Sequence, residues 1–140
     1  MSRIFCYQLK VPDDAVDENG HVNNVVYVHW MQDAAVRHSD STGCTQATKE
    51  EGATWVVRSH KIEYLRPAFG GDQIEVMTWV SNFRRVRSVR KYKFLRSDDN
   101  TVLARGTTDW VFVAADTGQP RAIPDSVKTL FELVPEYQEP

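Results

Sequence analysis

Residues 17–30 read DENGHVNNVVYVHW and decide the fold, because they join a tight polar loop directly to an apolar helix. Gly20 supplies the backbone freedom that the turn needs. Either Asn23 or Asn24 suits the N-cap of the helix. The free N–H groups and the positive dipole end of the helix then point toward Asp17. A carboxylate that faces such an oxyanion site is the minimum equipment for attacking a carbonyl group.

The helix that begins in this stretch is predicted to run from Asn24 to about Ser39. Nearly every residue between Val25 and Val36 is apolar, and the polar side chains form one narrow stripe, made of His29, Gln32, Asp33 and Arg37. A helix with so wide an apolar face needs cover on most of its sides. We therefore predict a core helix.

An antiparallel sheet is predicted around this helix. A first strand precedes the helix at 4–11, and four β-like segments follow it, at 54–66, 73–83, 87–96 and 101–115. Short turns rich in Gly, Asp and Asn separate them. Within 54–66 the alternation predicts Val56, Ile62 and Tyr64 on one face, and Trp55 and Val57 on the other. A short C-terminal helix is expected over 124–134, with Pro at its start.

This order of elements predicts an α+β fold, in which an antiparallel sheet wraps around one long central helix. At 140 residues the chain is expected to be a single domain over 1–140. The formal net charge of −2 argues against nucleic acid as a partner. No apolar run approaches 18 residues and no N-terminal signal pattern is present, so we expect neither a membrane span nor export.

The cysteines indicate no disulfide framework and no metal site. Only Cys6 and Cys44 occur, with no CxxC motif and no His at metal-ligand spacing. Two reduced thiols are the ordinary state in the cytoplasm, which is the location we predict.

Residues 13–35 resemble the signature of the hotdog-fold thioesterases, both the 4-hydroxybenzoyl-CoA thioesterase-like branch and the plant acyl-ACP thioesterases. A second stretch, IEYLRPA at 62–68 followed by Gly71-Asp72, is similar to a strand and turn of that family. The resemblance implies the hotdog fold, on which the sequence pattern agrees. It also implies hydrolysis of an acyl thioester without a metal or redox cofactor. Family members are normally homodimers or homotetramers with sites between subunits, and we expect the same here.

The resemblance also assigns roles to residues of the loop. In the hydroxybenzoyl-CoA branch the pattern is Asp, two residues, Gly and then the helix, which Asp17-Glu18-Asn19-Gly20 matches. Asp17 would then attack the thioester or activate water, and the N–H that polarises the carbonyl falls at Asn24.

The plant enzymes correspond through Asp17, Asn19 and His21, where an imidazole can act as general base. They carry a further polar catalytic residue about 35 positions beyond the His, where this chain has Trp55-Val56-Val57. An arrangement led by Asp17 is therefore favoured. Without catalysis, Asp17 would only form an Asx-turn, and Asn19 and His21 would hold that turn by hydrogen bonds.

A basic run and an aromatic group are the remaining candidates for substrate contact. Seven cations fall within residues 84–96, where no acid occurs: Arg84, Arg85, Arg87, Arg90, Lys91, Lys93 and Arg96. They suit the phosphates of CoA or an acidic acyl carrier protein, with Arg87 and Arg90 as the assigned contacts. The alternative is an edge strand kept soluble by charge. Tyr27, like Trp30 and Trp55, would line an aryl pocket or fill the core.

Together these features predict an acyl-CoA thioesterase. Two alternatives remain open: the same hydrolysis on acyl-ACP, and a non-catalytic module that binds acyl thioesters on the same fold. A hotdog dehydratase fits less well, because the Asp-x-x-Gly run followed directly by the helix is more similar to hydrolases. The sequence leaves the acyl group undefined.

Overall fold

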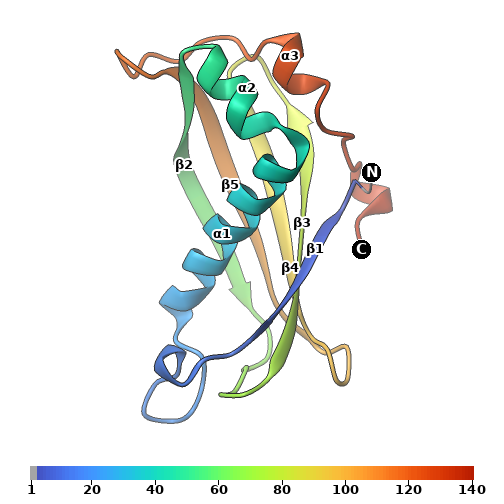
Figure 1. Ribbon diagram of the computed structural model, residues 1–140. Helices are drawn as coiled ribbons and strands as arrows, with labels where there is room; N and C mark the ends of the chain where they lie inside the picture. The colour runs from blue at the N-terminus through green and yellow to red at the C-terminus, as the bar shows by residue number, and fades with distance from the viewer. Residues whose placement is uncertain (1–2) are drawn as a thin grey trace.

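A five-stranded antiparallel sheet curves around one long helix in the computed structural model, which describes residues 3–140 (Figure 1). The strands are β1 (Phe5–Lys10), β2 (Ala53–Tyr64), β3 (Gln73–Phe83), β4 (Arg87–Arg96) and β5 (Val102–Ala114). Their order in the sheet is β1-β3-β4-β5-β2, so β1 and β2 form its two edges. Every pairing is antiparallel. The predicted α+β class and the sheet wrapped around a central helix are confirmed.

The helices lie on the concave face of the sheet and beside its upper end in Figure 1. They are α1 (Asn24–Thr42), α2 (Cys44–Glu50) and the short α3 (Asp125–Lys128), with 3-10 turns η1 (Asp13–Ala15) and η2 (Glu136–Gln138). The predicted domain, 1–140, includes residues 1 and 2, which lie outside the described part of the chain.

Helix α1 begins where the sequence pattern placed it. The side chain of Asn23 caps it, since its oxygen accepts a hydrogen bond from the Val25 amide at 3.1 Å. The helix ends at Gly43, whose φ of +85° gives a left-handed C-cap that suits glycine. Three residues more than expected are helical, because the chain has no earlier breaker than Gly43.

One face of α1 packs on the sheet. Its buried side chains recur every three or four residues and are Tyr27, Trp30, Met31, Ala34, Ala35 and His38. The opposite side is open, and Val25 and Val36 are 62% and 55% exposed. The expectation that the helix is covered on most sides is therefore wrong for a single chain, because one sheet reaches only one side of a helix.

Strand β2 departs from the predicted alternation. Its register with β5 shifts between Val57 and Ser59, which is the mark of a β-bulge. Before the bulge Trp55 faces the helix side, where its ring lies 5.0 Å from Phe112. After it Ile62 also faces the helix side, where it packs against the core that contains Tyr27 and Met31. The predicted grouping of Val56 with Ile62 is wrong, because one inserted residue exchanges the two faces of the strand.

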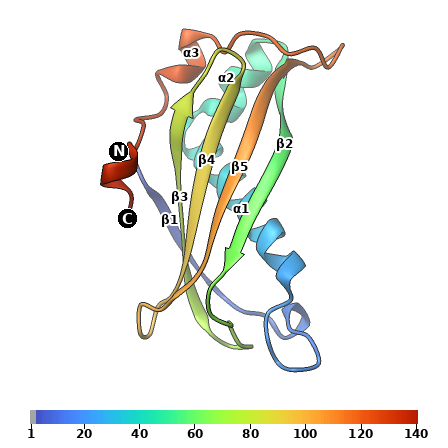
Figure 2. The ribbon, with the colours of Figure 1, turned by 180° about the vertical axis from the view of Figure 1, so that it is seen from behind.

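The basic strand β4 lies in the middle of the sheet, paired with β3 and β5 (Figure 2). The alternative of a charged edge strand is therefore wrong. Along β4 the side chains alternate, and the even-numbered ones are buried toward the helix: Ser88, Arg90, Tyr92 and Phe94.

The predicted C-terminal helix over 124–134 is shorter than expected. Only 125–128 form α3, and the following chain lies against β3, where the Val134 amide donates to the Val80 carbonyl at 3.0 Å. Farther on, Lys91 on β4 forms an ion pair with Glu139 at 2.6 Å. The Val134 amide therefore bonds to β3 instead of within a longer helix.

Helix α1 packs closely against β5 at Gly106. A Cβ atom there would lie 2.9 Å from the sulfur of Met31, so glycine permits the close approach of helix and strand. Tyr92 lies against the same spot, at 3.5 Å. The middle of the molecule is therefore filled, and it separates the two ends of α1.

Candidate active site

The Asp17 loop forms a tight turn just before α1. The Asp17 amide donates to the His21 carbonyl at 2.8 Å, and the Gly20 amide donates to the Asp17 carbonyl at 3.0 Å. Gly20 has φ of +78°, the left-handed region that the turn needs. The loop thus folds back on itself and brings Asp17 beside the start of the helix.

The carboxylate of Asp17 is held by the backbone through one of its two oxygens. Oδ1 accepts hydrogen bonds from the amides of Asn19, at 2.9 Å, and His21, at 3.1 Å. Oδ2 has no hydrogen-bond partner among residues 3–140, and the residue is exposed. The predicted Asx-type turn therefore exists, and it leaves one oxygen available to a substrate or a water molecule.

The helix start adds a free donor at the same end of the molecule. The Asn23 and Val26 amides bond to the carbonyls of Ala15 and Asn23, while the Val25 amide bonds to the Asn23 side chain. Within the described chain the Asn24 amide has no such partner. A helix N-terminus with a free N–H is a site for an oxyanion.

The loop between β2 and β3 packs against the Asp17 loop. The Val22 amide donates to the Ala68 carbonyl at 2.8 Å, and the rings of His21 and Phe69 meet edge to face, 5.2 Å apart. Asp72 holds the Phe69 amide at 2.9 Å and pairs with Arg96 at 3.2 Å. This support joins residues distant in the sequence, and the sequence analysis did not predict it. The similarity of 62–72 to the family was the signal that pointed there.

His21 and Asn19 lie in the loop as predicted, both exposed. Their backbone amides hold the Asp17 carboxylate, which is the turn-holding role. The His21 ring contacts Phe69. This geometry brings Asp17, Asn19 and His21 into one loop next to Asn24.

The predicted substrate contacts Tyr27, Arg87 and Arg90 lie outside the Asp17 loop. Tyr27 is 3% exposed and packs edge to face on Trp30, Tyr64 and Phe94. Burial raises its pKa to about 12. It fills the core between α1 and the sheet.

Arg87 and Arg90 are not brought together, because residues three apart on a strand point to opposite faces. Arg87 lies on the outer face of β4 in an ion pair with Asp109. Arg90 is 5% exposed on the inner face, among the helices. The two predicted contacts therefore lie on opposite faces of the sheet.

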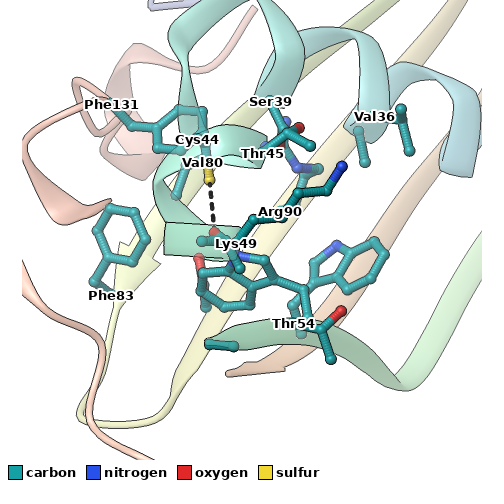
Figure 3. Close-up of a pocket in the computed structure, with 16 residues that line it drawn as sticks. Val36, Ser39, Cys44, Thr45, Lys49, Thr54, Val80, Phe83, Arg90 and Phe131 are labelled. Carbon is teal, nitrogen blue, oxygen red and sulfur yellow. Dashed lines mark hydrogen bonds between the residues drawn. The ribbon is translucent and has the colours of Figure 1, made fainter. Parts of the chain in front are cut away.

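A cavity of about 270 Å³ opens beside Arg90, between α1, α2 and the strands β2, β3, β4 and β5 (Figure 3). It lies near the Thr42 end of α1, whereas the Asp17 loop precedes Asn24. The 19 residues of α1 span about 28 Å at 1.5 Å per residue, so the two sites of one chain are well separated. The sequence pattern did not predict this cavity, since its walls come from two helices, four strands and the C-terminal segment.

The part of the chain that the structure describes contains no cluster of three or more His, Cys, Asp and Glu side chains able to hold a metal ion. Both cysteines are free thiols, Cys6 exposed and Cys44 buried. No helix within 3–140 has the length and apolarity needed to cross a membrane. The cytoplasmic location stays a prediction.

Residues 11–131 match the family model described as the Thioesterase-like superfamily. The chain is 27% identical over 132 residues to the acyl-CoA thioester hydrolase YbgC of Escherichia coli, covering 92% of this chain and 96% of that protein. It is 29% identical over 128 residues to the acyl-acyl carrier protein thioesterase ATL2 of Arabidopsis thaliana, covering 89% of this chain.

The chain spans 66% of the Arabidopsis protein and 32% of the related hydrolase FATB3 from Cuphea viscosissima. Among solved structures, the 1,4-dihydroxy-2-naphthoyl-CoA thioesterase from Synechocystis superposes with a TM-score of 0.81 at 19% identity. That alignment covers 91% of this chain and 94% of the other. The structural likeness confirms the predicted hotdog fold.

Proposed function

Because this chain belongs to the thioesterase-like superfamily, we propose that it is an acyl-CoA thioesterase. In this reaction water cleaves the bond between acyl carbon and sulfur, giving a free acid and the thiol of CoA. The observation that carries the proposal is the Asp17 loop: one carboxylate oxygen is fixed by two backbone amides and the other is available, next to a helix start with a free amide.

Two chemical routes suit this site. In one, the Asp17 carboxylate attacks the carbonyl and expels the thiolate, and water then hydrolyses the mixed anhydride. In the other, Asp17 takes a proton from a water molecule as that water attacks. In both routes the carbonyl oxygen gains negative charge, which the free Asn24 amide and the helix dipole stabilise. His21 and Asn19 would take over the chemistry only in a plant-like arrangement.

Turnover tests the proposal directly. A free-thiol assay with short, medium, long-chain and aromatic acyl-CoAs would show CoA release if the chain is an enzyme. The same acyl group presented on CoA and on acyl carrier protein would separate the two carriers, since relatives of both kinds exist. Tight binding of acyl-CoA without release of thiol would show the non-catalytic module instead.

The turn geometry of the loop gives one prediction. Gly20→Ala should lower kcat by up to about tenfold, because an alanine in the left-handed region costs roughly 1–2 kcal/mol. No atom lies within 4 Å of the added methyl group, so the effect comes from backbone strain. Gly20→Asn is the matched control and should keep more activity, because Asn tolerates this conformation. Wild-type kcat in Gly20→Ala would show that the turn does not position Asp17.

The exposed arginines at the start of the basic run give a second prediction. Arg84 and Arg85 lie exposed in the turn between β3 and β4, and neither forms an ion pair within 3–140. If the CoA phosphates contact this end of the run, Arg84→Gln with Arg85→Gln should raise KM for acyl-CoA by roughly two- to tenfold. The salt dependence of KM should also flatten.

An acyl-pantetheine substrate, which lacks the nucleotide, serves as the control for this pair of substitutions. Its KM should be nearly unchanged. Equal losses on both substrates would instead assign the arginines a structural role.

We also propose that the chain forms a homodimer or a homotetramer. The open side of α1 and the neighbouring edge strand β2 expose Val25, Val36 and Val56, the last 44% exposed. Antiparallel pairing of two β2 edges would join the two sheets, with Val56 on the paired strand, and would bring the open sides of the two α1 helices together. Because β2 would run in opposite directions in the two copies, the Asp17 loop of one copy would lie near the cavity of the other.

Light scattering at micromolar concentration should therefore give at least twice the chain mass of 16.1 kDa. Val56→Asp should reduce this mass, because a charge on the edge strand β2 disfavours edge-to-edge pairing. Leu133→Asp is the matched control. Leu133 is 39% exposed, but it belongs to the C-terminal segment, which runs beside β3 and away from the edge strand β2 (Figure 1). A wild-type mass of one chain would contradict the assembly.

A further inference from the structure

The cavity beside Arg90 contains a buried positive charge that no neighbouring carboxylate of residues 3–140 neutralises. Arg90 is buried, 5% exposed, and Lys49 is the one other charged residue among those that line the cavity. No Asp or Glu is among the lining residues. Figure 3 shows the cavity walls, which also include apolar side chains such as Val80 and Phe83.

The hydrogen bonds of Arg90 use only part of its guanidinium group. Nη1 donates to Nδ1 of His38 at 2.8 Å and to the Thr78 hydroxyl at 3.2 Å. Within residues 3–140, Nε and Nη2 have no hydrogen-bond partner, and no carboxylate lies within ion-pair distance of the group. An arginine presents Nε and Nη2 as a fork that matches the two oxygens of a carboxylate.

His38 does not neutralise the positive charge of Arg90. Burial and the neighbouring Arg90 lower the pKa of His38 to about 3, so the imidazole is neutral at physiological pH and accepts the hydrogen bond at Nδ1. The Phe131 ring lies 5.6 Å from the guanidinium carbon and offers a further favourable contact. Neither group supplies the negative charge that a buried cation needs.

We propose that this cavity binds a small carboxylate, with the guanidinium of Arg90 as its charged contact and Lys49 at the same site. The carboxylate would balance the buried charge and fill the free side of the fork. The volume of about 270 Å³ corresponds to roughly nine water molecules at ~30 Å³ each, which is the size of a short aliphatic or aryl acid.

Such a carboxylate has two sources. One is a free carboxylic acid. The other is the distal carboxylate of an acyl group, which would enter from a thioester held at the Asp17 loop of a second copy, because the loop of the same chain lies at the other end of α1. The second source rests on the proposed function and assembly, and the first does not.

Calorimetry with hexanoate and hexanamide tests the site without any turnover. These probes have the same size and differ in charge, so hexanoate should bind the wild-type protein at least about tenfold more tightly. Arg90→Met should remove this preference, whereas Arg105→Met, on the exposed face of β5, should keep it. Equal affinity of the wild type for both probes, or no binding of either, would overturn the proposal even if Arg90→Met failed to fold.

Kinetics with adipoyl-CoA and hexanoyl-CoA separate the two sources. If the distal carboxylate is the ligand, Arg90→Met should lower the ratio of their kcat/KM values by at least about tenfold. An unchanged ratio, together with Arg90-dependent hexanoate binding, assigns the site to a free acid. If no acyl-CoA of the full panel is hydrolysed, the proposed function fails while the calorimetry still decides the site.

Discussion

Asp17→Asn is expected to lower kcat for acyl-CoA hydrolysis by at least about 10², while KM changes little. An amide can neither form a mixed anhydride readily nor take a proton from water. The substitution keeps the size of the side chain, and its amide oxygen can still accept the hydrogen bonds from the Asn19 and His21 amides. The loop should therefore stay folded and still bind substrate. Steady-state kinetics and the affinity for acyl-CoA measure the two effects separately.

His21→Ala is the comparison that distinguishes the two family arrangements. If Asp17 leads the chemistry, this variant should lose less activity than Asp17→Asn, because the amide of residue 21 still holds the carboxylate. A larger loss in His21→Ala, with most activity retained in Asp17→Asn, would favour the plant-like arrangement. Full activity in both variants of an active enzyme would place the site elsewhere.

Phe94→Ala should lower the free energy of unfolding by about 3–5 kcal/mol. Phe94 is 0% exposed on the inner face of β4, and its ring centroid lies 5.1 Å from that of Tyr27, edge to face, and 6.1 Å from that of Trp30. The truncation removes buried apolar surface and leaves a cavity under α1 that these rings fill only in part. Chemical unfolding at a fixed protein concentration measures the change, since assembly would make stability depend on concentration.

Tyr137→Ala is the matched control for this truncation. Tyr137 is 85% exposed, so the loss of its ring should change the free energy of unfolding by no more than about 0.5 kcal/mol. A cost for Phe94→Ala as small as that of the control would show that the interface between α1 and the sheet does not limit stability.

The features that the sequence determined are those set by neighbouring residues. The spacing from Asp17 to Gly20 defines the turn, and the Asn23 side chain reaches the amide two residues on, so loop and helix start are predictable from the local chain. The repeat of apolar residues in α1 and the alternation in β3 reflect the periods of helix and strand. Together they were sufficient for the α+β fold and for gathering Asp17, Asn19, His21 and Asn24 at one end of it.

The tertiary structure alone decided the features that depend on pairing between distant segments. The bulge in β2 exchanges the faces of that strand, and the central place of β4 follows from its pairing with both β3 and β5. Which face of β4 meets α1 then decides that Arg90 is buried beside the cavity while Arg87 meets Asp109 outside. The run of basic residues does not show which face of β4 is buried, because arginine occurs on both faces of the strand. Only the register of the sheet and the packing of the helix turn one of these arginines into a buried cation without a counter-charge.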